Sequence, residues 1–172
     1  TPDPDRGWAL AALAGTLSIA TVKSAAIRAM AEERFDPMLF RMSREYVGDT
    51  AETVALMWPD SADDAPPPSV SEVIDLLNST SRARAPSVLA KLMDRLDANG
   101  RYALLKLASG GMRVGISARL AKTAFAQAFD LSVDDVEEVW HALRPPYTEL
   151  FAWGEGETDR PDPADSAFFR PF

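Results

Sequence analysis

The sequence contains no cysteine and a single histidine, His141, among 172 residues. Without cysteine the chain forms no disulfide and no thiolate metal site, and a histidine without a histidine or cysteine partner is a poor zinc ligand. We therefore expect no metal on this chain. The absence of cysteine also fits a cytoplasmic location.

Long hydrophobic runs are absent as well. No stretch of eighteen apolar residues is present, which predicts that the chain does not span or anchor in a membrane. The first residues have neither the basic nor the apolar segment of a signal peptide, and they look like a cut through a longer protein. We expect a cytoplasmic protein.

Recognisable catalytic constellations are missing too. The sequence has no Walker-type phosphate loop and no nucleophile elbow. Four carboxylates, at Asp134, Asp135, Glu137 and Glu138, follow Ser132 closely. They are predicted to lie in the first turns of a helix that Ser132 would cap, and the positive end of the helix dipole explains their position there. We expect no catalytic residue on this chain.

Charge is distributed unevenly. The whole chain carries −8, which by itself argues against nucleic acid. However, nine basic and only two acidic residues lie between Arg82 and Lys122, so that this window carries +7. Because the local field steers a polyanion, the window is a candidate surface for DNA, although helices rich in alanine and arginine also use arginine for solvation.

Apolar residues recur at helical spacing, and 47% of the chain is hydrophobic. The fold class that this pattern predicts is all-α, with nine or ten helices. The predicted helices cover residues 7–17, 24–34, 37–47, 50–58, 69–77, 86–96, 101–109, 116–129, 132–143 and 147–153. Residues 154–172, rich in proline and acids, are predicted to form an extended linker.

The same spacing assigns faces to three of these helices. The helix that follows the Asp36 cap is predicted to bury Met38, Leu39, Met42 and Tyr46. The helix over 101–109 is predicted to bury Tyr102, Leu105 and Ala108 and to expose Arg101 and Lys106. The helix over 116–129 is predicted to bury Ile116, Leu120, Ala124, Phe125 and Ala128 and to expose Ser117, Arg119, Lys122 and Thr123.

One stretch, Leu104 to Leu120, joins a helix end to a helix start through three glycines. Gly110 and Gly111 are natural helix stops, because glycine adopts positive φ without a Cβ penalty. Gly115 allows close approach of the backbone just before the next helix begins. The unsatisfied N–H groups of that helix start and the Arg113 guanidinium together predict a phosphate cradle. The alternative is an ordinary helix–turn–helix connection with a solvated Arg113.

A second glycine turn occupies Val47 to Glu52. Gly48 is predicted to end one helix, and Asp49 is predicted to cap the next, with Glu52 at the reciprocal capping position. This arrangement explains both acids without catalytic chemistry.

Three segments of the chain resemble the N-terminal DNA-binding domain of bacterial ATP-dependent DNA ligases. The main one is Leu-Leu-Lys-Leu-x-x-Gly-Gly-Met-Arg-Val-Gly-Ile-Ser at 104–117, and the others are the Gly-Asp-x-x-Glu turn at 48–52 and the segment at 142–151. The resemblance implies a compact multi-helix domain of two similar halves over residues 1–153. Its first helix or two look missing, and residues 154–172 would lead to an absent nucleotidyltransferase domain.

The resemblance also implies a function. The domain would grip nicked double-stranded DNA by its backbone while other domains seal the nick in replication, repair or recombination. Candidate DNA-binding residues are Arg113, Gly111, Gly115, Ser117, Arg119, Lys122, Lys106, Gly110, Gly48 and Thr50. Gly48 and Thr50, rather than the neighbouring acids, would face the DNA.

The parent enzyme of such a domain would use ATP and Mg²⁺, with a nucleotidyltransferase domain and an OB-fold domain in cis. Its adenylated lysine lies in a Lys-x-Asp-Gly motif, and none of the four lysines here precedes x-Asp-Gly. We therefore expect this chain to hold no cofactor and to be inactive alone. The alternative function is a helical protein-interaction scaffold without a nucleic-acid role, which the net acidity favours.

Overall fold

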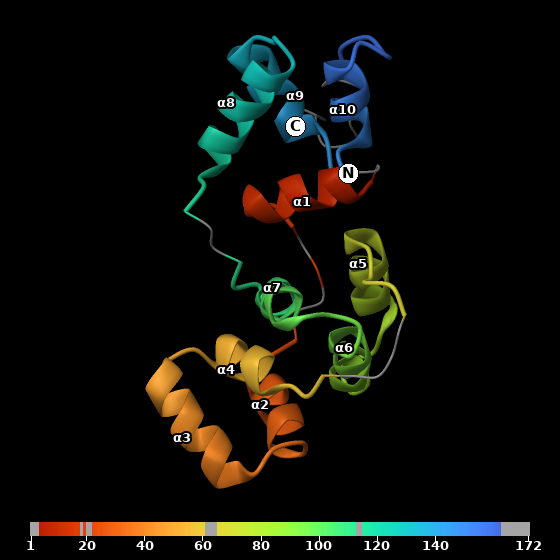
Figure 1. Ribbon diagram of the computed structural model, residues 1–172. Coiled ribbons are helices and arrows are strands. Elements are labelled where there is room, and N and C mark those ends of the chain that lie inside the picture. The colour runs from red at the N-terminus through yellow and green to blue at the C-terminus, as the bar shows by residue number, and fades with distance from the viewer. Residues whose placement is uncertain (1–3, 18, 20–21, 61–64, 113–114, 163–172) are drawn as a thin grey trace, which may run out of the picture. The chain divides into compact units, whose positions relative to one another are not determined.

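The computed structural model describes residues 4–17, 19, 22–60, 65–112 and 115–162 of the chain. Within these ranges the secondary structure is helical and contains no strand, which confirms the predicted all-α class (Figure 1). The helices are α1 Asp5–Leu13, α2 Ser24–Glu32, α3 Pro37–Val47, α4 Thr50–Met57, α5 Val70–Ser79, α6 Ala85–Met93, α7 Ala98–Ala108, α8 Ala118–Ala128, α9 Val133–Ala142 and α10 Thr148–Gly154.

The chain divides into two compact units. A central unit consists of Ser18–Met112, and a terminal unit combines Thr1–Leu17 with Arg113–Phe172. Each unit has a hydrophobic core of its own. The boundary at Met112 and Arg113 divides the glycine-rich stretch that the sequence analysis singled out.

In the central unit, α4 and α7 pack against each other, and α2 contacts α3, α4 and α6. Large side chains that are almost fully buried in this core come from four helices. They include Val54, Leu77, Leu89, Met93 and Leu105. Fully burying aliphatic side chains of this size contributes about 1.5–3 kcal/mol each, so this core supplies the main stabilisation of the unit.

The predicted helix caps are confirmed in this unit. The Asp36 carboxylate accepts hydrogen bonds from the Met38 and Leu39 amides at 3.0 and 2.9 Å, with Pro37 in the first helical position. The Ser69 hydroxyl likewise accepts the Glu72 amide at 3.0 Å. These bonds satisfy N–H groups that have no partner within their own helix.

The predicted buried face of α3 is wrong. Phe40 is the side chain of α3 that enters the core, where its ring contacts Phe35. The four residues expected inside are exposed instead: Met38 by 62%, Leu39 by 57%, Met42 by 62% and Tyr46 by 93%. The apolar arc of α3 is wider than its contact with α2 and α4, so only one edge of the arc is covered.

Arg101, predicted at the surface, is buried with 3% of its area exposed. Its Nη1 donates to the Trp58 carbonyl oxygen at 3.0 Å, and its Nε donates to the Met93 carbonyl oxygen at 3.1 Å. The outer part of the guanidinium reaches Asp60 Oδ1 at 3.3 Å. Arg101 therefore joins the C-terminal ends of α4 and α6 to α7.

Tyr102, which was predicted to lie inside, is partly exposed.

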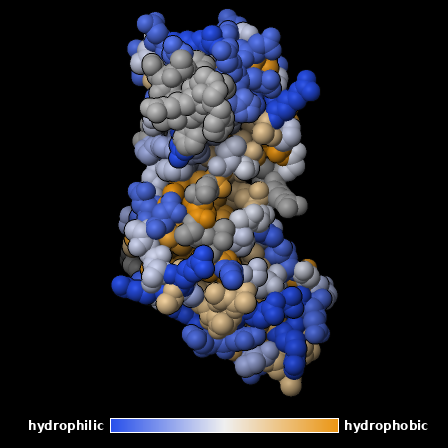
Figure 2. All heavy atoms as spheres, turned by 180° about the vertical axis from the view of Figure 1, so that it is seen from behind, coloured by the Kyte–Doolittle hydropathy of each residue, from blue (hydrophilic) through white to orange (hydrophobic). Residues whose placement is uncertain are grey.

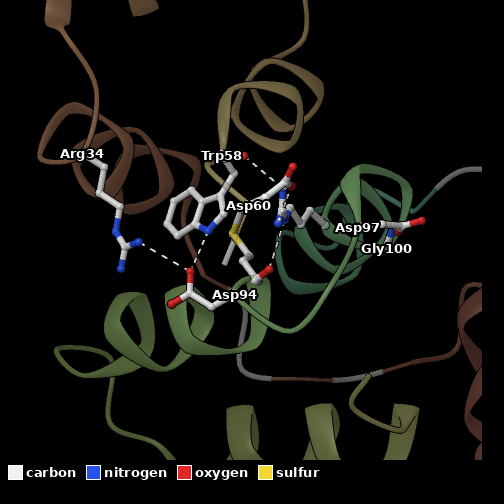
Figure 3. A network of polar contacts seen from close by, with 8 residues as sticks. Arg34, Trp58, Asp60, Asp94, Asp97 and Gly100 are labelled. Carbon is white, nitrogen blue, oxygen red and sulfur yellow. Dashed lines mark hydrogen bonds and ion pairs between the residues drawn. The ribbon is translucent and has the colours of Figure 1, made fainter. Parts of the chain in front are cut away.

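The same helix ends are held by a second set of contacts (Figure 3). The Trp58 indole N–H donates to Asp94 Oδ1 at 2.8 Å, and Arg34 Nη1 lies 3.5 Å from the same oxygen. The Arg34 guanidinium also lies 4.4 Å from the centre of the Trp58 ring. This network fixes the end of α4 and thereby the direction of that helix.

The terminal unit packs α8 against α9 and α1. Its core contains an aromatic group in which Phe125 lies 4.7 Å from Phe129 and 5.2 Å from Phe151 between ring centres. The faces of α8 differ from the prediction. Of the residues expected inside, only Phe125 is buried, and Ile116, Leu120, Ala124 and Ala128 are exposed.

The beginning of the predicted linker is attached to the terminal unit. Gly154 is the last residue of α10, and Glu155 accepts a hydrogen bond from Arg6 Nη2 at 2.8 Å. Arg160 lies 3.4 Å from Asp135 and also pairs with Glu138. Glu155 and Arg160 therefore contact α1 and α9, respectively, and residues 163–172 of the predicted linker lie outside the described residues.

Gly7 allows the backbone of α1 to lie very close to the backbone of Pro146. It is buried in α1, and a Cβ placed on it would lie 1.4 Å from the Pro146 carbonyl oxygen. The Tyr147 hydroxyl next to this contact forms a 2.9 Å hydrogen bond with the Thr16 hydroxyl. The N-terminal helix is thus held against the loop between α9 and α10 by backbone proximity.

We expect Gly7→Ala to lower the free energy of unfolding by about 1–3 kcal/mol, because the new methyl group forces α1 away from the Pro146 backbone. Urea denaturation followed by circular dichroism measures the loss. Gly100→Ala is the matched control, since the nearest atom to its Cβ is the movable Leu96 Cδ2 at 2.9 Å. An equal loss for both variants contradicts the expectation.

We expect Arg101→Met to lower the free energy of unfolding by about 2–3 kcal/mol, because two buried carbonyl oxygens lose a charged donor. Arg28→Met, on an exposed position of α2, should change it by less than about 0.5 kcal/mol. Equilibrium urea unfolding of both variants provides the comparison. A small effect at Arg101 would show that its hydrogen bonds contribute little.

Candidate nucleic-acid interface

The structure separates the predicted DNA-binding residues into two groups. The central unit contains Gly48, Thr50, Lys106, Gly110 and Gly111, and the terminal unit contains Gly115, Ser117, Arg119 and Lys122. Arg113, the first candidate, lies outside the described residues.

The glycine pair ends α7 as predicted. Gly110 has a φ of 71°, and the Gly111 amide donates to the Lys106 carbonyl oxygen at 2.9 Å. This bond satisfies a carbonyl that the helix leaves without a partner. Gly110 and Gly111 thus have a structural role at the end of the helix that carries Lys106.

The helix start after Gly115 also follows the prediction, but two residues later. α8 begins at Ala118, and the Ser117 hydroxyl caps it by accepting the Leu120 amide at 3.1 Å. Gly115 has a φ of 73°, and a Cβ there would meet no atom within 4 Å. The turn is therefore open in front of the helix start.

The two cations of α8 have different environments. Arg119 is exposed, and its guanidinium has no bond or ion pair among the described residues. Lys122, predicted outside, is buried with 8% of its area exposed, and its Nζ lies 3.5 Å from His141 Nε2 and 4.0 Å from Glu137. Packing against α9 gives Lys122 an internal partner, which leaves Arg119 as the cation of α8 available to a phosphate.

The second glycine turn lies at the start of α4. Gly48 has a φ of 83° and ends α3, and Asp49 Oδ1 caps α4 by accepting the Glu52 amide at 3.0 Å. A hollow of about 220 Å³ opens beside this turn. Its lining comes from three segments that are distant in the sequence: Ser24 and Ile27, residues 48–51, and Lys106 with Ser109.

Lys106 and Asp49 form an ion pair at this hollow. Burial acts to raise the pKa of the Asp49 carboxyl, but the hydrogen bond from Lys106 and the Glu52 amide outweigh it, so that the pKa lies below its ordinary value. The bond to Asp49 in turn raises the pKa of the Lys106 ammonium. The pair therefore stays charged at neutral pH and holds Lys106 beside the glycine turn.

Sequence analysis missed Arg44. This residue lies in the last turn of α3, and its Nε donates to the Thr50 hydroxyl oxygen at 2.8 Å. Two cations thus lie at the start of α4, with Lys106 paired to Asp49 and Arg44 bonded to Thr50. The available signal was the position of Arg44 four residues before Gly48, which places a basic side chain at the helix C-terminus beside the turn.

The two units thus contain a similar local arrangement of glycine, capping residue and helix. In each, a glycine with positive φ precedes a capping side chain, Asp49 or Ser117, and a new helix follows. A Cβ at Gly48 or Gly115 would meet no atom within 4 Å. Such turns leave room for a large anion near amide donors, and each has at least one neighbouring cation.

Other chemistry finds no support in the described part of the chain. No three side chains of His, Cys, Asp or Glu there are grouped so that they could hold a metal ion. His141 is exposed and lies beside Lys122. None of the helices in the described ranges has the length and apolarity that crossing a bilayer requires.

From its fold and these turns, the protein is classed as an all-helical chain of two units with two open glycine turns. Comparison with known proteins does not narrow this class. No family model matches the chain, and neither the curated proteins nor the solved structures yield a match.

The Asp49–Lys106 pair makes stability depend on pH. Because the pKa of Asp49 is lowered on folding, the contribution of the pair is present above about pH 4, the ordinary carboxyl value, and is lost as the pH falls through the lower folded value. We expect a coupling energy of about 0.5–1 kcal/mol at pH 7 in the cycle of Asp49→Asn, Lys106→Met and the double variant.

Urea unfolding of these four proteins at pH 7 and at about pH 2.5 measures the coupling. Asparagine retains the capping oxygen, so the cycle isolates the ion pair from the cap. A coupling energy that is absent at pH 7, or unchanged in acid, contradicts the expectation.

Proposed function

We propose that this chain is the non-catalytic DNA-binding domain of an ATP-dependent DNA ligase, which grips nicked duplex DNA by its sugar–phosphate backbone. The observation that carries the proposal is the open glycine turn that recurs in the two units, before α4 and before α8. Both turns fall on the segments of the sequence that resemble this ligase domain.

The chemistry of the turns suits phosphate rather than bases. Amide groups at a helix start, the Thr50 hydroxyl and the guanidinium groups of Arg44 and Arg119 are donors that recognise phosphate oxygens. Contacts of this kind fix the position of a duplex without reading its sequence. An enzyme that seals nicks at any sequence requires this kind of binding.

Asp49 limits how a phosphate approaches the first turn. Its carboxylate occupies the start of α4 and already neutralises Lys106. A phosphate would therefore be bound from the side of Gly48 and Thr50, next to Arg44, and away from the Asp49 carboxylate that lines the same hollow. At the second turn the cap is the uncharged Ser117, and Arg119 lies in the first turn of α8.

The sealing chemistry belongs to other parts of the proposed parent enzyme. A nucleotidyltransferase domain and an OB-fold domain in cis would use ATP and Mg²⁺ to activate and join the 5′-phosphate end. The residues of the present chain would hold the DNA on either side of the nick and exclude rotation of its ends. A helical interaction scaffold is the second candidate, and the net charge of −8 favours it.

Fluorescence anisotropy with a labelled nicked duplex tests the proposal. We expect binding at low salt that weakens steeply as salt rises, because neutralised phosphates release counterions. Arg113→Ala should cost about 1.5–3 kcal/mol of binding free energy, the range for a charged hydrogen bond. Arg119→Gln should weaken binding and lower the slope of the salt dependence by about one.

Arg160→Gln is the control, because this arginine is already paired with Asp135 and Glu138. Its removal should leave DNA affinity nearly unchanged. A wild-type chain that fails to retain duplex DNA at low salt, or equal effects of the Arg119 and Arg160 variants, would favour the scaffold.

A further inference from the structure

Exposed hydrophobic side chains gather on α3. Met38, Leu39, Met42 and Tyr46 are all exposed there, whereas each other helix in the described ranges exposes at most one large hydrophobic side chain. Figure 2 shows the face opposite to that of Figure 1, on which hydrophilic residues predominate towards both ends of the picture. Single exposed hydrophobic residues are normal, but a group of four on one helix indicates an interaction surface.

The geometry of α3 makes these four residues one continuous stripe. Successive residues of an α-helix are about 100° apart, so Met38, Met42, Tyr46 and Leu39 fall within an arc of about 100°. Phe40, which enters the core, lies about 100° further round. Figure 1 shows α3 at the margin of the central unit, beside α4. The stripe therefore faces away from its own core.

The charged residues beside the stripe indicate that its partner is a second copy of this chain. Arg41 and Glu45 lie four residues apart on one flank of it, and Ser43 lies on the other flank. Both charged residues are exposed, and neither has an ion pair in the described part of the chain. In an antiparallel pair of identical helices, each flank faces the same flank of the partner. Arg41 of one copy then reaches Glu45 of the other, and the contact occurs twice.

We propose that the α3 stripe is the contact surface of an antiparallel, two-fold symmetric dimer of this chain. Centring the contact at the level of residue 43 places Arg41 of one copy level with Glu45 of the other, and it keeps Met38 within about 3 Å along the helix axis of the partner's Tyr46, so that the apolar stripes cover each other. A parallel pair would instead place the Arg41 and Glu45 flank against the uncharged Ser43 flank. A two-fold contact also closes on itself, so it limits assembly to two copies.

The size of the stripe sets the strength of this dimer. Four side chains cover less than the roughly 800 Å² per partner of a stable interface. The dimer should therefore be weak, with a dissociation constant above about 1 µM. The inference goes beyond the proposed DNA binding and does not rest on it, because it uses none of the residues at the glycine turns.

Sedimentation equilibrium between about 5 and 500 µM chain tests the proposal. The wild-type chain should pass from monomer to dimer in this range, and Met42→Asp should raise the dissociation constant at least tenfold. Leu120→Asp, which changes a comparably exposed leucine of α8, is the matched control and should leave it unchanged. Circular dichroism verifies that both variants are folded.

Charge reversal tests the antiparallel arrangement. Arg41→Glu and Glu45→Arg should each raise the dissociation constant about three- to tenfold, because each creates two like-charge contacts. An equimolar mixture of the two variants should form a heterodimer with the affinity of the wild type, and the chain carrying both changes should regain it too.

Three results would overturn the proposal. A wild-type chain that stays monomeric to 500 µM excludes the dimer, and a dimer insensitive to Met42→Asp excludes the stripe as its surface. A mixture of charge variants that fails to recover affinity excludes the antiparallel pairing. Anisotropy of Met42→Asp on nicked DNA separates the two proposals, since lost dimerisation with retained DNA binding is the expected outcome.

Discussion

The packing of α4 against α7 is the constraint on which the rest of the central unit depends. At one end of this helix pair, the Arg101 guanidinium joins the Trp58 and Met93 carbonyl oxygens. At the other end, Lys106 on α7 pairs with Asp49 at the start of α4. Both ends of α4 are therefore tied to α7, and the glycine turn before α4 is held in a fixed position relative to Lys106.

This arrangement connects stability to the proposed function. The ion pair with Asp49 largely neutralises the positive charge of Lys106 within the protein. In the proposed function, phosphate binding at this turn would therefore depend on Arg44 and Thr50, which a hydrogen bond of 2.8 Å already brings together. A turn that is organised before DNA arrives loses little conformational entropy on binding.

The terminal unit achieves a similar turn with different means. Ser117 caps α8 without bringing a charge, and the aromatic group around Phe125 holds the other end of the helix. Lys122 is directed inward to His141, which leaves Arg119 as the exposed cation of α8. Both turns therefore have a glycine with positive φ before a capped helix start, whereas their electrostatics differ, and an anion would meet a weaker repulsion at the second.

The sequence by itself determined the features that depend on neighbours within about four residues. The caps at Asp36, Asp49 and Ser69 and the stops at Gly48 and Gly110 are of this kind, because their hydrogen bonds and φ preferences are local. Only the tertiary structure decided which residues are buried. Arg101 is buried because carbonyl oxygens eight and 43 residues away meet its guanidinium. The α3 stripe is exposed because none of the other described helices covers that edge of the apolar arc.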